Sequence, residues 1–283
     1  MFHMKLSTEK LAQKAKDGNR DALERLIMRI QDKIYGLALK MLGRPEDAED
    51  AAQEILVKII TLLGGFRGES SFETWMYRIA SNHLLTTRKR SAEKIGFPLE
   101  LIEEQSNNMV SGSVQNLPMD PENKLLVEEV RMRCMQATLL CLNRKERLAF
   151  ILGEIFQVTS KEGAEILDIA PATFRKRLSR GRDRVGEFMK NCGLIHSSAL
   201  CHCANIASDG IKTGWLKQSN LLFAGKKCSS FRKDEIKAFL KEWDEMKGMA
   251  ELFRSYPEYK APDSFVSLAK DYLNLKQRDK ILH

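Results

Sequence analysis

A run of cations between Pro171 and Lys190 holds seven basic residues against two acidic ones. On a helix that begins at Pro171, Phe174, Leu178 and Val185 fall on one side, and polar and basic residues cover the others. Such a face supplies cations for phosphates and forked donors for guanine edges in a major groove. A basic helix that only faces solvent is the alternative. The predicted DNA-facing residues are Ala172, Thr173, Arg175, Lys176, Arg177, Ser179 and Arg180.

Two further helices would position this basic helix. The pairs Asn143/Glu146 and Thr159/Glu162 each have capping-box spacing, which marks two helix starts. A tight turn is predicted at residues 168–169, immediately before the basic helix. The spacing is that of a helix-turn-helix, which favours DNA binding over the solvent-facing alternative.

An acidic helix is predicted earlier in the chain, where residues 44–58 hold five acids against two bases. Asp50, Gln53 and Glu54 share one face, which would repel DNA but suits a protein partner. A di-metal or acid/base site would need inward-facing Glu and a Glu-His pair, and no His lies near. The predicted docking residues are Asp47, Asp50, Gln53 and Glu54. The predicted buried face holds Ala48, Ala52, Ile55, Ile59 and Leu62.

Aromatic and basic residues alternate between Phe66 and Arg90, where a third helix is predicted over roughly residues 71–90. Aromatic rings beside cations suit unstacked, single-stranded bases. The same rings can equally be core residues, and the spacing favours the core for Phe72. Composition alone leaves these two readings open.

The whole chain has 283 residues and a formal net charge of +8, which indicates several compact units and a polyanionic partner. Helical periodicity dominates, so an all-α fold is predicted: two small helical domains, a flexible linker and a helical C-terminal extension. No apolar run is long enough to span a membrane, and a cytoplasmic location is expected. The predicted divisions are 1–95, an acidic linker at 96–122, 123–192 and an extension at 193–283.

Four cysteines follow the basic helix: Cys192, Cys201, Cys203 and Cys228. They could bind zinc or sense redox state, with His196 or His202 as an alternative ligand. Their spacing departs from paired C-x2-C knuckles, so ordinary reduced thiols remain an equal alternative. The extension is predicted to begin irregularly and then to form an apolar helical stripe from Ile236 to Phe253. Because that stripe must be buried against something, we expect the extension to regulate the chain in cis.

The strings RPEDAEDAAQEILVKI and FRGESSFETWMYRIASN resemble the second domain of extracytoplasmic-function sigma factors. The string NRKERLAFILGEIFQVTSKEGAEILDIAPATFRKRLSRGRDRV resembles their fourth domain, and the order matches over roughly the first 190 residues. The resemblance implies that the acidic helix docks on the clamp helices of the largest polymerase subunit. It further implies that the helix from Pro171 reads the −35 element of a promoter. The residues implied at the −10 element are Phe66, Arg67, Ser70, Ser71, Trp75, Asn82, Arg88, Lys89 and Arg90.

A sigma factor with no catalysis of its own is therefore expected, with core RNA polymerase (clamp helices and flap) and promoter DNA as partners. The resemblance leaves an anti-sigma factor open as a further partner. A helix-turn-helix regulator that does not dock on polymerase is the alternative, although it would need neither the acidic helix nor the aromatic loop. Two positions depart from the family pattern, because Asp168 stands where Gly is usual and Ala170 where Ser or Thr is usual.

Overall fold

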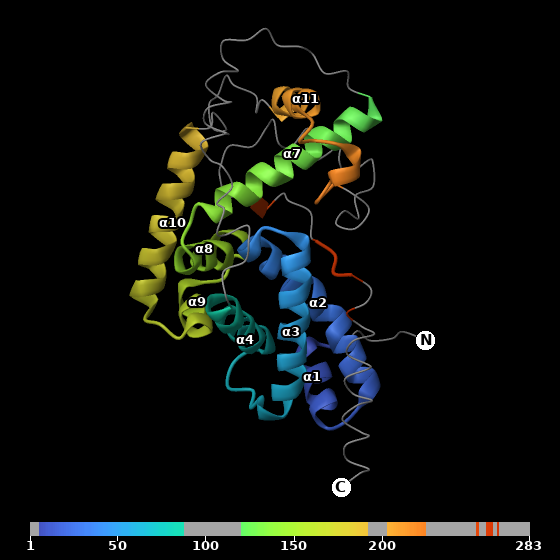
Figure 1. The fold of residues 1–283 in the computed structure, drawn as a ribbon. Helices are drawn as coiled ribbons and strands as arrows, with labels where there is room; N and C mark the ends of the chain where they lie inside the picture. Colours follow the sequence, from blue (N-terminus) through green and yellow to red (C-terminus); the bar gives the residue numbers. More distant parts are fainter. Residues whose placement is uncertain are drawn as a thin grey trace.

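The computed structural model describes residues 6–87, 120–191, 203–224, 253–254, 259–262 and 265. All regular structure in these ranges is helical, which confirms the predicted fold class (Figure 1). The helices are α1 (Thr8–Lys16), α2 (Arg20–Leu42), α3 (Pro45–Leu62), α4 (Phe72–Thr86), α7 (Pro121–Leu140), α8 (Arg144–Phe150), α9 (Ser160–Leu167), α10 (Pro171–Asn191) and α11 (Cys203–Thr213). Shorter helical turns lie at Leu63–Gly65, Ile151–Ile155 and Gln218–Asn220.

The first unit is built from α1 to α4, with α2 at its centre. The side chain of Asn19 caps α2 by accepting a hydrogen bond from the Ala22 amide at 2.8 Å. Gly43 ends the helix with φ +80°, a conformation that only glycine adopts without strain, and Pro45 opens α3. The predicted apolar face of α3 is buried except at Leu62, which is 50% exposed because it lies at the end of the helix.

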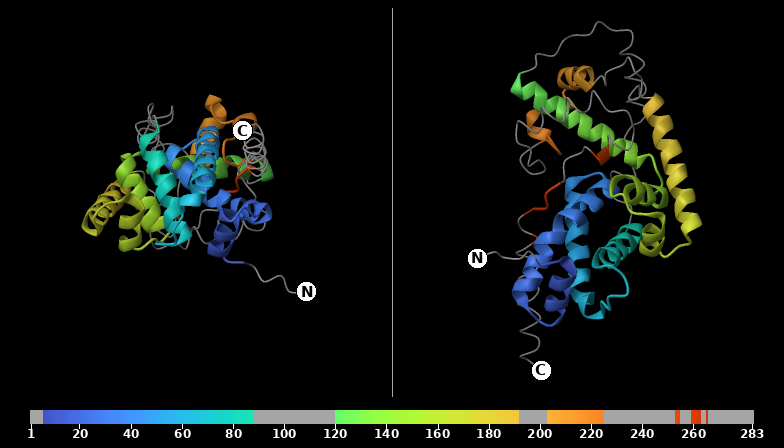
Figure 2. Two further views of the ribbon diagram at one scale, coloured as in Figure 1. Left: turned by 90° about the horizontal axis from the view of Figure 1, so that it is seen from below. Right: turned by 180° about the vertical axis from the view of Figure 1, so that it is seen from behind.

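The second unit is built from α7 to α10. The long helix α7 crosses above the short helices α8 and α9, and α10 runs beside them (Figures 1 and 2). The Asn143 side chain caps α8 as predicted, by accepting from the Glu146 amide at 3.0 Å. The Glu146 carboxylate, however, lies 2.7 Å from Arg184 of α10, so the ion pair replaces the reciprocal half of the predicted box.

The two units pack directly against each other, with α4 on α9, and one apolar core runs through both. Two arginines of α8 join them. Arg144 donates to the carbonyls of Leu85 and Thr87 at the end of α4. Arg147 donates to the carbonyl of Met41 near the end of α2. Such contacts place cations at the negative ends of helices of the first unit.

Several element boundaries differ from the sequence predictions. The helix predicted to reach Arg90 ends at Thr86, because Thr87 leaves the helix and its hydroxyl bonds to the His83 carbonyl at 2.7 Å. The short helix α1 was not predicted, and α7 starts at Pro121, inside the predicted linker. Residues 203–213, predicted to be irregular, form α11 because an apolar face there packs on α7. The linker residues 96–119 and the stripe from 236 to 250 lie outside the described residues.

Candidate nucleic-acid and polymerase interface

The basic helix α10 divides its faces as the sequence predicts. Phe174, Leu178 and Val185 are buried against the second unit. Arg182 and Arg184 are drawn toward that unit by the buried carboxylates of Glu154 and Glu146. The exposed residues in the first half of α10 are Ala172, Thr173, Arg175, Lys176, Ser179 and Arg180, and Arg177 is half-buried. All the predicted −35 residues therefore lie on one connected, cationic outer surface.

The helix-turn-helix that presents α10 is formed by local hydrogen bonds. Thr159 and Glu162 make the predicted capping box at the start of α9. The Thr159 hydrogen bonds lower the pKa of the Glu162 carboxyl below its usual value. Asp168 ends α9 with φ 50° and ψ 54°, the left-handed conformation that the turn requires. Ala170, which precedes α10, has no side-chain hydroxyl that could cap the helix. Its backbone carbonyl accepts hydrogen bonds from the Thr173 and Phe174 amides at 2.9 and 3.1 Å.

Asp168 provides a prediction about stability. Replacing Asp168 with Gly should raise the free energy of unfolding by about 0.5 kcal/mol, because Gly adopts the left-handed conformation without a Cβ penalty. Replacing Asp168 with Ala should lower it by about 1 kcal/mol. Urea unfolding followed by circular dichroism measures both. Changes of the same sign for the two variants would contradict the left-handed turn.

The acidic face of α3 points away from the core. Asp50 and Glu54 are exposed, and Asp47 and Gln53 are half-buried beside them. Glu54 also lies 3.6 Å from the buried ring of His83 on α4, which joins the acidic face to the helix behind it. The structure thus brings the four predicted docking residues onto one surface, which is negatively charged and separate from α10.

The aromatic loop between α3 and α4 is built around the buried ring of Phe66. Phe66 was expected to face DNA, but its ring is only 8% exposed. It packs edge-on against Phe72 and at a tilt against Trp75, with ring centroids 5.4 Å apart in both pairs. Lys16 of α1 donates to the Phe66 carbonyl at 2.9 Å and fixes the loop from the other side. The Phe66 ring is therefore buried among apolar rings, where it fixes the shape of the loop.

The other predicted −10 residues are accessible where the structure describes them. Arg67 and Ser71 are exposed, and Ser70 and Trp75 are half-buried. The Ser71 hydroxyl caps α4 by accepting from the Thr74 amide at 3.1 Å. Asn82 is exposed about one turn before the C-terminal end of α4, on the same unit. Arg88, Lys89 and Arg90 lie outside the described residues.

The cysteine prediction stays a prediction. Cys192, Cys201 and Cys228 lie outside the described residues, and Cys203 is the first residue of α11. In the described ranges no group of three or more His, Cys, Asp or Glu could hold a metal ion. Two other cysteines, Cys134 and Cys141, are reduced and not in a disulfide. Burial raises the pKa of the Cys141 thiol to about 11, so it stays protonated at neutral pH.

Comparison with known proteins matches both units to one family. Residues 26–94 match the model of Sigma-70 region 2, and residues 132–185 match that of Sigma-70, region 4. The ECF RNA polymerase sigma-E factor of Escherichia coli (strain K12) is 30% identical over 184 residues, which are 64% of this chain and 93% of that protein. The chain belongs to the extracytoplasmic-function (ECF) sigma factors. This assignment replaces the alternative of a regulator that acts without polymerase.

Other relatives of this ECF sigma factor span the same share of the chain. The RNA polymerase sigma-H factor of Pseudomonas aeruginosa is 27% identical over 186 residues, which are 93% of that protein. A solved structure of CnrH in complex with the cytosolic domain of CnrY is 20% identical, covers 65% of this chain and 97% of that one, and has a TM-score of 0.46. Residues after 185 lie outside both matched regions.

Sequence reasoning missed one residue of this ECF sigma factor that organises the extension. Glu129 of α7 is fully buried and binds residues 222–224. The available signal was an acid placed among Leu126, Val127 and Val130 on an apolar face.

No helix within the described ranges is both long and apolar enough to cross a membrane.

Proposed function

We propose that this sigma factor docks on core RNA polymerase through Asp47, Asp50, Gln53 and Glu54 of α3, with the flap as a second contact for the α7–α10 unit. The loop at residues 67–71, together with Trp75 and Asn82, takes up the −10 element of the melted strand. The outer face of α10 reads the −35 element. The protein has no catalytic role of its own, and it works in the cytoplasm beside polymerase.

The observation that carries this proposal is the separation of charge between two exposed helix faces. The outer face of α10 offers arginine and lysine donors, which phosphates and guanine edges accept. The outer face of α3 offers carboxylates, which DNA repels and a basic protein surface attracts. A protein that only binds DNA has no use for the second face, whereas one that must join DNA to polymerase needs both.

Charge reversal on α3 tests the docking surface. The change of both Asp50 and Glu54 to Lys should weaken binding to bacterial core RNA polymerase by about tenfold to a hundredfold, because it replaces attraction by repulsion. A matched control changes two exposed acids elsewhere, Glu9 and Glu122, to Lys and so gives the same change in net charge. Binding is measured by fluorescence anisotropy at fixed salt. Equal loss in both variants, or no loss in either, would contradict docking by this face.

A further inference from the structure

The described pieces of the C-terminal extension lie outside both sigma-region matches, yet they pack on both units. The first piece, residues 203–224, sits on α7. Ala207 of α11 and Leu216 share a small apolar core with Leu126, Val127 and Val130 of α7. Arg133 of α7 adds a cation–π contact, its guanidinium lying 5.7 Å from the centre of the Trp215 ring. This piece is therefore docked over the helix that opens the second unit.

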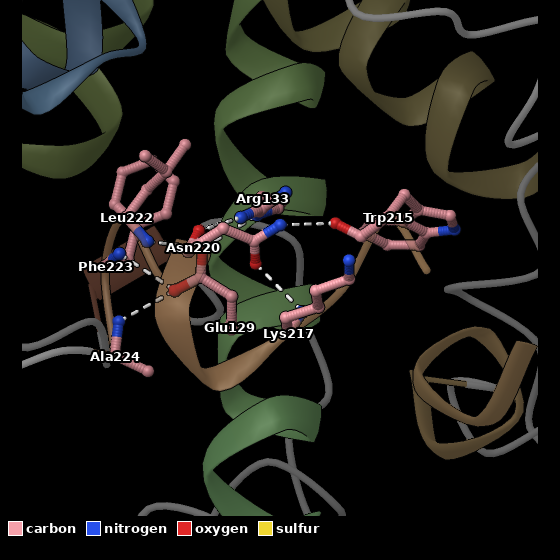
Figure 3. Close-up of polar contacts among 8 residues, drawn as sticks. All are labelled: Glu129, Arg133, Trp215, Lys217, Asn220, Leu222, Phe223 and Ala224. Atoms are coloured by element: carbon pink, nitrogen blue, oxygen red, sulfur yellow. Dashed lines mark hydrogen bonds and ion pairs between the residues drawn. The ribbon is translucent and has the colours of Figure 1, made fainter. Parts of the chain in front are cut away.

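A buried carboxylate latches this piece in place. Three successive backbone amides, of Leu222, Phe223 and Ala224, donate to the carboxylate of Glu129 at 2.8 Å each (Figure 3). Arg133 donates to the same carboxylate at 2.7 Å. Because Glu129 is 0% exposed, it needs these donors to offset the loss of water. The chain after α11 is thus fixed at a defined point on α7.

The second piece consists of the described residues 253–254, 259–262 and 265, and its first two residues contact the second unit. The Phe253 ring stands edge-on against Phe150, with centroids 5.3 Å apart. Arg254 donates to the Glu154 carbonyl at 2.9 Å, and its guanidinium is 3.9 Å from the Glu154 carboxylate. The same carboxylate accepts from Arg182 of α10 at 2.6 Å. The extension is therefore connected through one acid to the basic helix.

The same piece continues onto the first unit. The Ala261 amide donates to the Asp32 carboxylate of α2 at 2.8 Å. The buried Phe265 ring stands edge-on to Tyr35 of α2, with centroids 6.2 Å apart.

Between these contacts lies Tyr259, which is 2% exposed and reaches both units at once. Lys40 of α2 lies 4.8 Å from the centre of its ring, and Gln136 of α7 donates to its hydroxyl at 3.3 Å. Of the described residues in this part of the chain, 253–254 thus lie on the second unit, 261 and 265 lie on the first, and Tyr259 contacts both. We name the described residues 253–254, 259–262 and 265 the strap.

The two units also touch directly, through the helices that carry or support the reading surfaces. Arg78 of α4 donates to the Glu165 carbonyl of α9 at 3.1 Å. The rings of Tyr77 and Phe156 lie 5.5 Å apart. The helix α9 has 8 residues, about 12 Å in length, and the first turns of α10 follow it directly. The −10 and −35 surfaces are therefore only a few helix diameters apart.

Promoter geometry demands a much wider separation. The −10 and −35 elements are centred about 25 base pairs apart, which is about 85 Å of B-form DNA at about 3.4 Å per pair. Two surfaces joined through α4 and α9 cannot reach both elements at once. Reading a promoter therefore requires that the two units separate.

We infer that the C-terminal extension is a built-in clamp, latched on α7 and strapped across both units, that holds the sigma factor in a closed state unable to span a promoter. This inference rests on the proposed function, in which α4 and α10 read the two elements. The clamp uses only segments beyond the sigma-region matches, so opening it leaves the reading and docking surfaces intact. Core polymerase, which needs the separated form, competes with the strap.

The direct test changes both Tyr259 and Phe265 to Ala in the full chain. Each change removes a buried ring, and such a change weakens a packed contact by more than about tenfold. We expect a larger radius of gyration in small-angle X-ray scattering and an affinity for core polymerase raised by about tenfold or more, because the competent fraction rises. Circular dichroism checks that the helical content is kept. An unchanged radius and an unchanged affinity would overturn the clamp.

A second test separates the clamp from the proposed function. In the strap variant, Asp50 and Glu54 are also changed to Lys. One outcome is that the combined variant loses binding to core polymerase while the strap variant binds no more tightly than wild type. In that case the clamp is wrong and the docking proposal is supported. If core binding survives the reversal, the docking proposal is wrong, and the radius of gyration still decides on the clamp because it needs no polymerase.

The latch has a matched pair of neighbours for an independent test. Glu129→Gln should raise hydrogen exchange at residues 222–224 by about tenfold or more, because the charge that holds these amides is lost. Glu128→Gln is the control: Glu128 is also buried, at 3% exposure, but its Oε1 atom has no hydrogen-bond partner among the described residues. Equal exchange in the two variants would overturn the latch.

Discussion

Replacing Arg147 with Met will lower the free energy of unfolding by about 3–5 kcal/mol, a large share of the stability of a chain of this size. Arg147 is 3% exposed, and its guanidinium satisfies carbonyls at the ends of two helices. Without it these buried acceptors lose their donors, and each unsatisfied group costs about 1–3 kcal/mol. The accepting carbonyls are those of Leu139 at 2.9 Å, Leu142 at 2.8 Å, Leu140 at 3.3 Å, and Met41.

Urea unfolding followed by circular dichroism measures the effect, with Lys145→Met as the control. Lys145 lies on the same helix but is exposed, so its loss should change stability by less than about 0.5 kcal/mol. Similar stability in the two variants would show that water, and not Arg147, satisfies the helix ends. The comparison matters because Arg147 contacts carbonyls of both units.

The helix boundaries and faces of this protein follow from local sequence wherever a short-range cause exists. The Thr159–Glu162 box and the Asp168 turn are set within a few residues of chain, and both form as predicted. The face of α10 follows from the spacing of Phe174, Leu178 and Val185, all of which are buried. In each case the side chain and its partner are neighbours in sequence, so the pattern alone is sufficient.

The rest depends on partners distant in the chain. Glu129 accepts from three backbone amides more than ninety residues away, and Asp32 accepts from the Ala261 amide, which is farther still. Phe66 looked like a surface platform because its burial depends on Phe72 and Trp75 meeting it after the chain turns. The direct packing of α4 on α9 likewise has no local signature. Such contacts are decided by which apolar surfaces remain uncovered once the helices form.

Replacing Gly163 with Ala will lower the free energy of unfolding by about 3 kcal/mol, although Ala is the better helix former. Gly163 lies inside α9, where a Cβ atom would stand 2.3 Å from Cε2 and 2.4 Å from Cζ of Phe174. The Phe174 ring is fully buried, so moving it would disturb the side chains packed around it. The close approach of α9 and α10, which orients the basic outer face of α10, therefore requires glycine at this position.

Gly186→Ala is the matched control on the neighbouring helix. A Cβ atom at Gly186 meets nothing within 4 Å, so this change should raise stability by about 0.5–1 kcal/mol through helix propensity alone. The two substitutions are chemically identical, and the opposite signs isolate the contact with Phe174. Urea unfolding measures both. If Gly163→Ala stabilises the protein as Gly186→Ala does, α9 and α10 do not approach this closely, and the orientation of the basic face must have another cause.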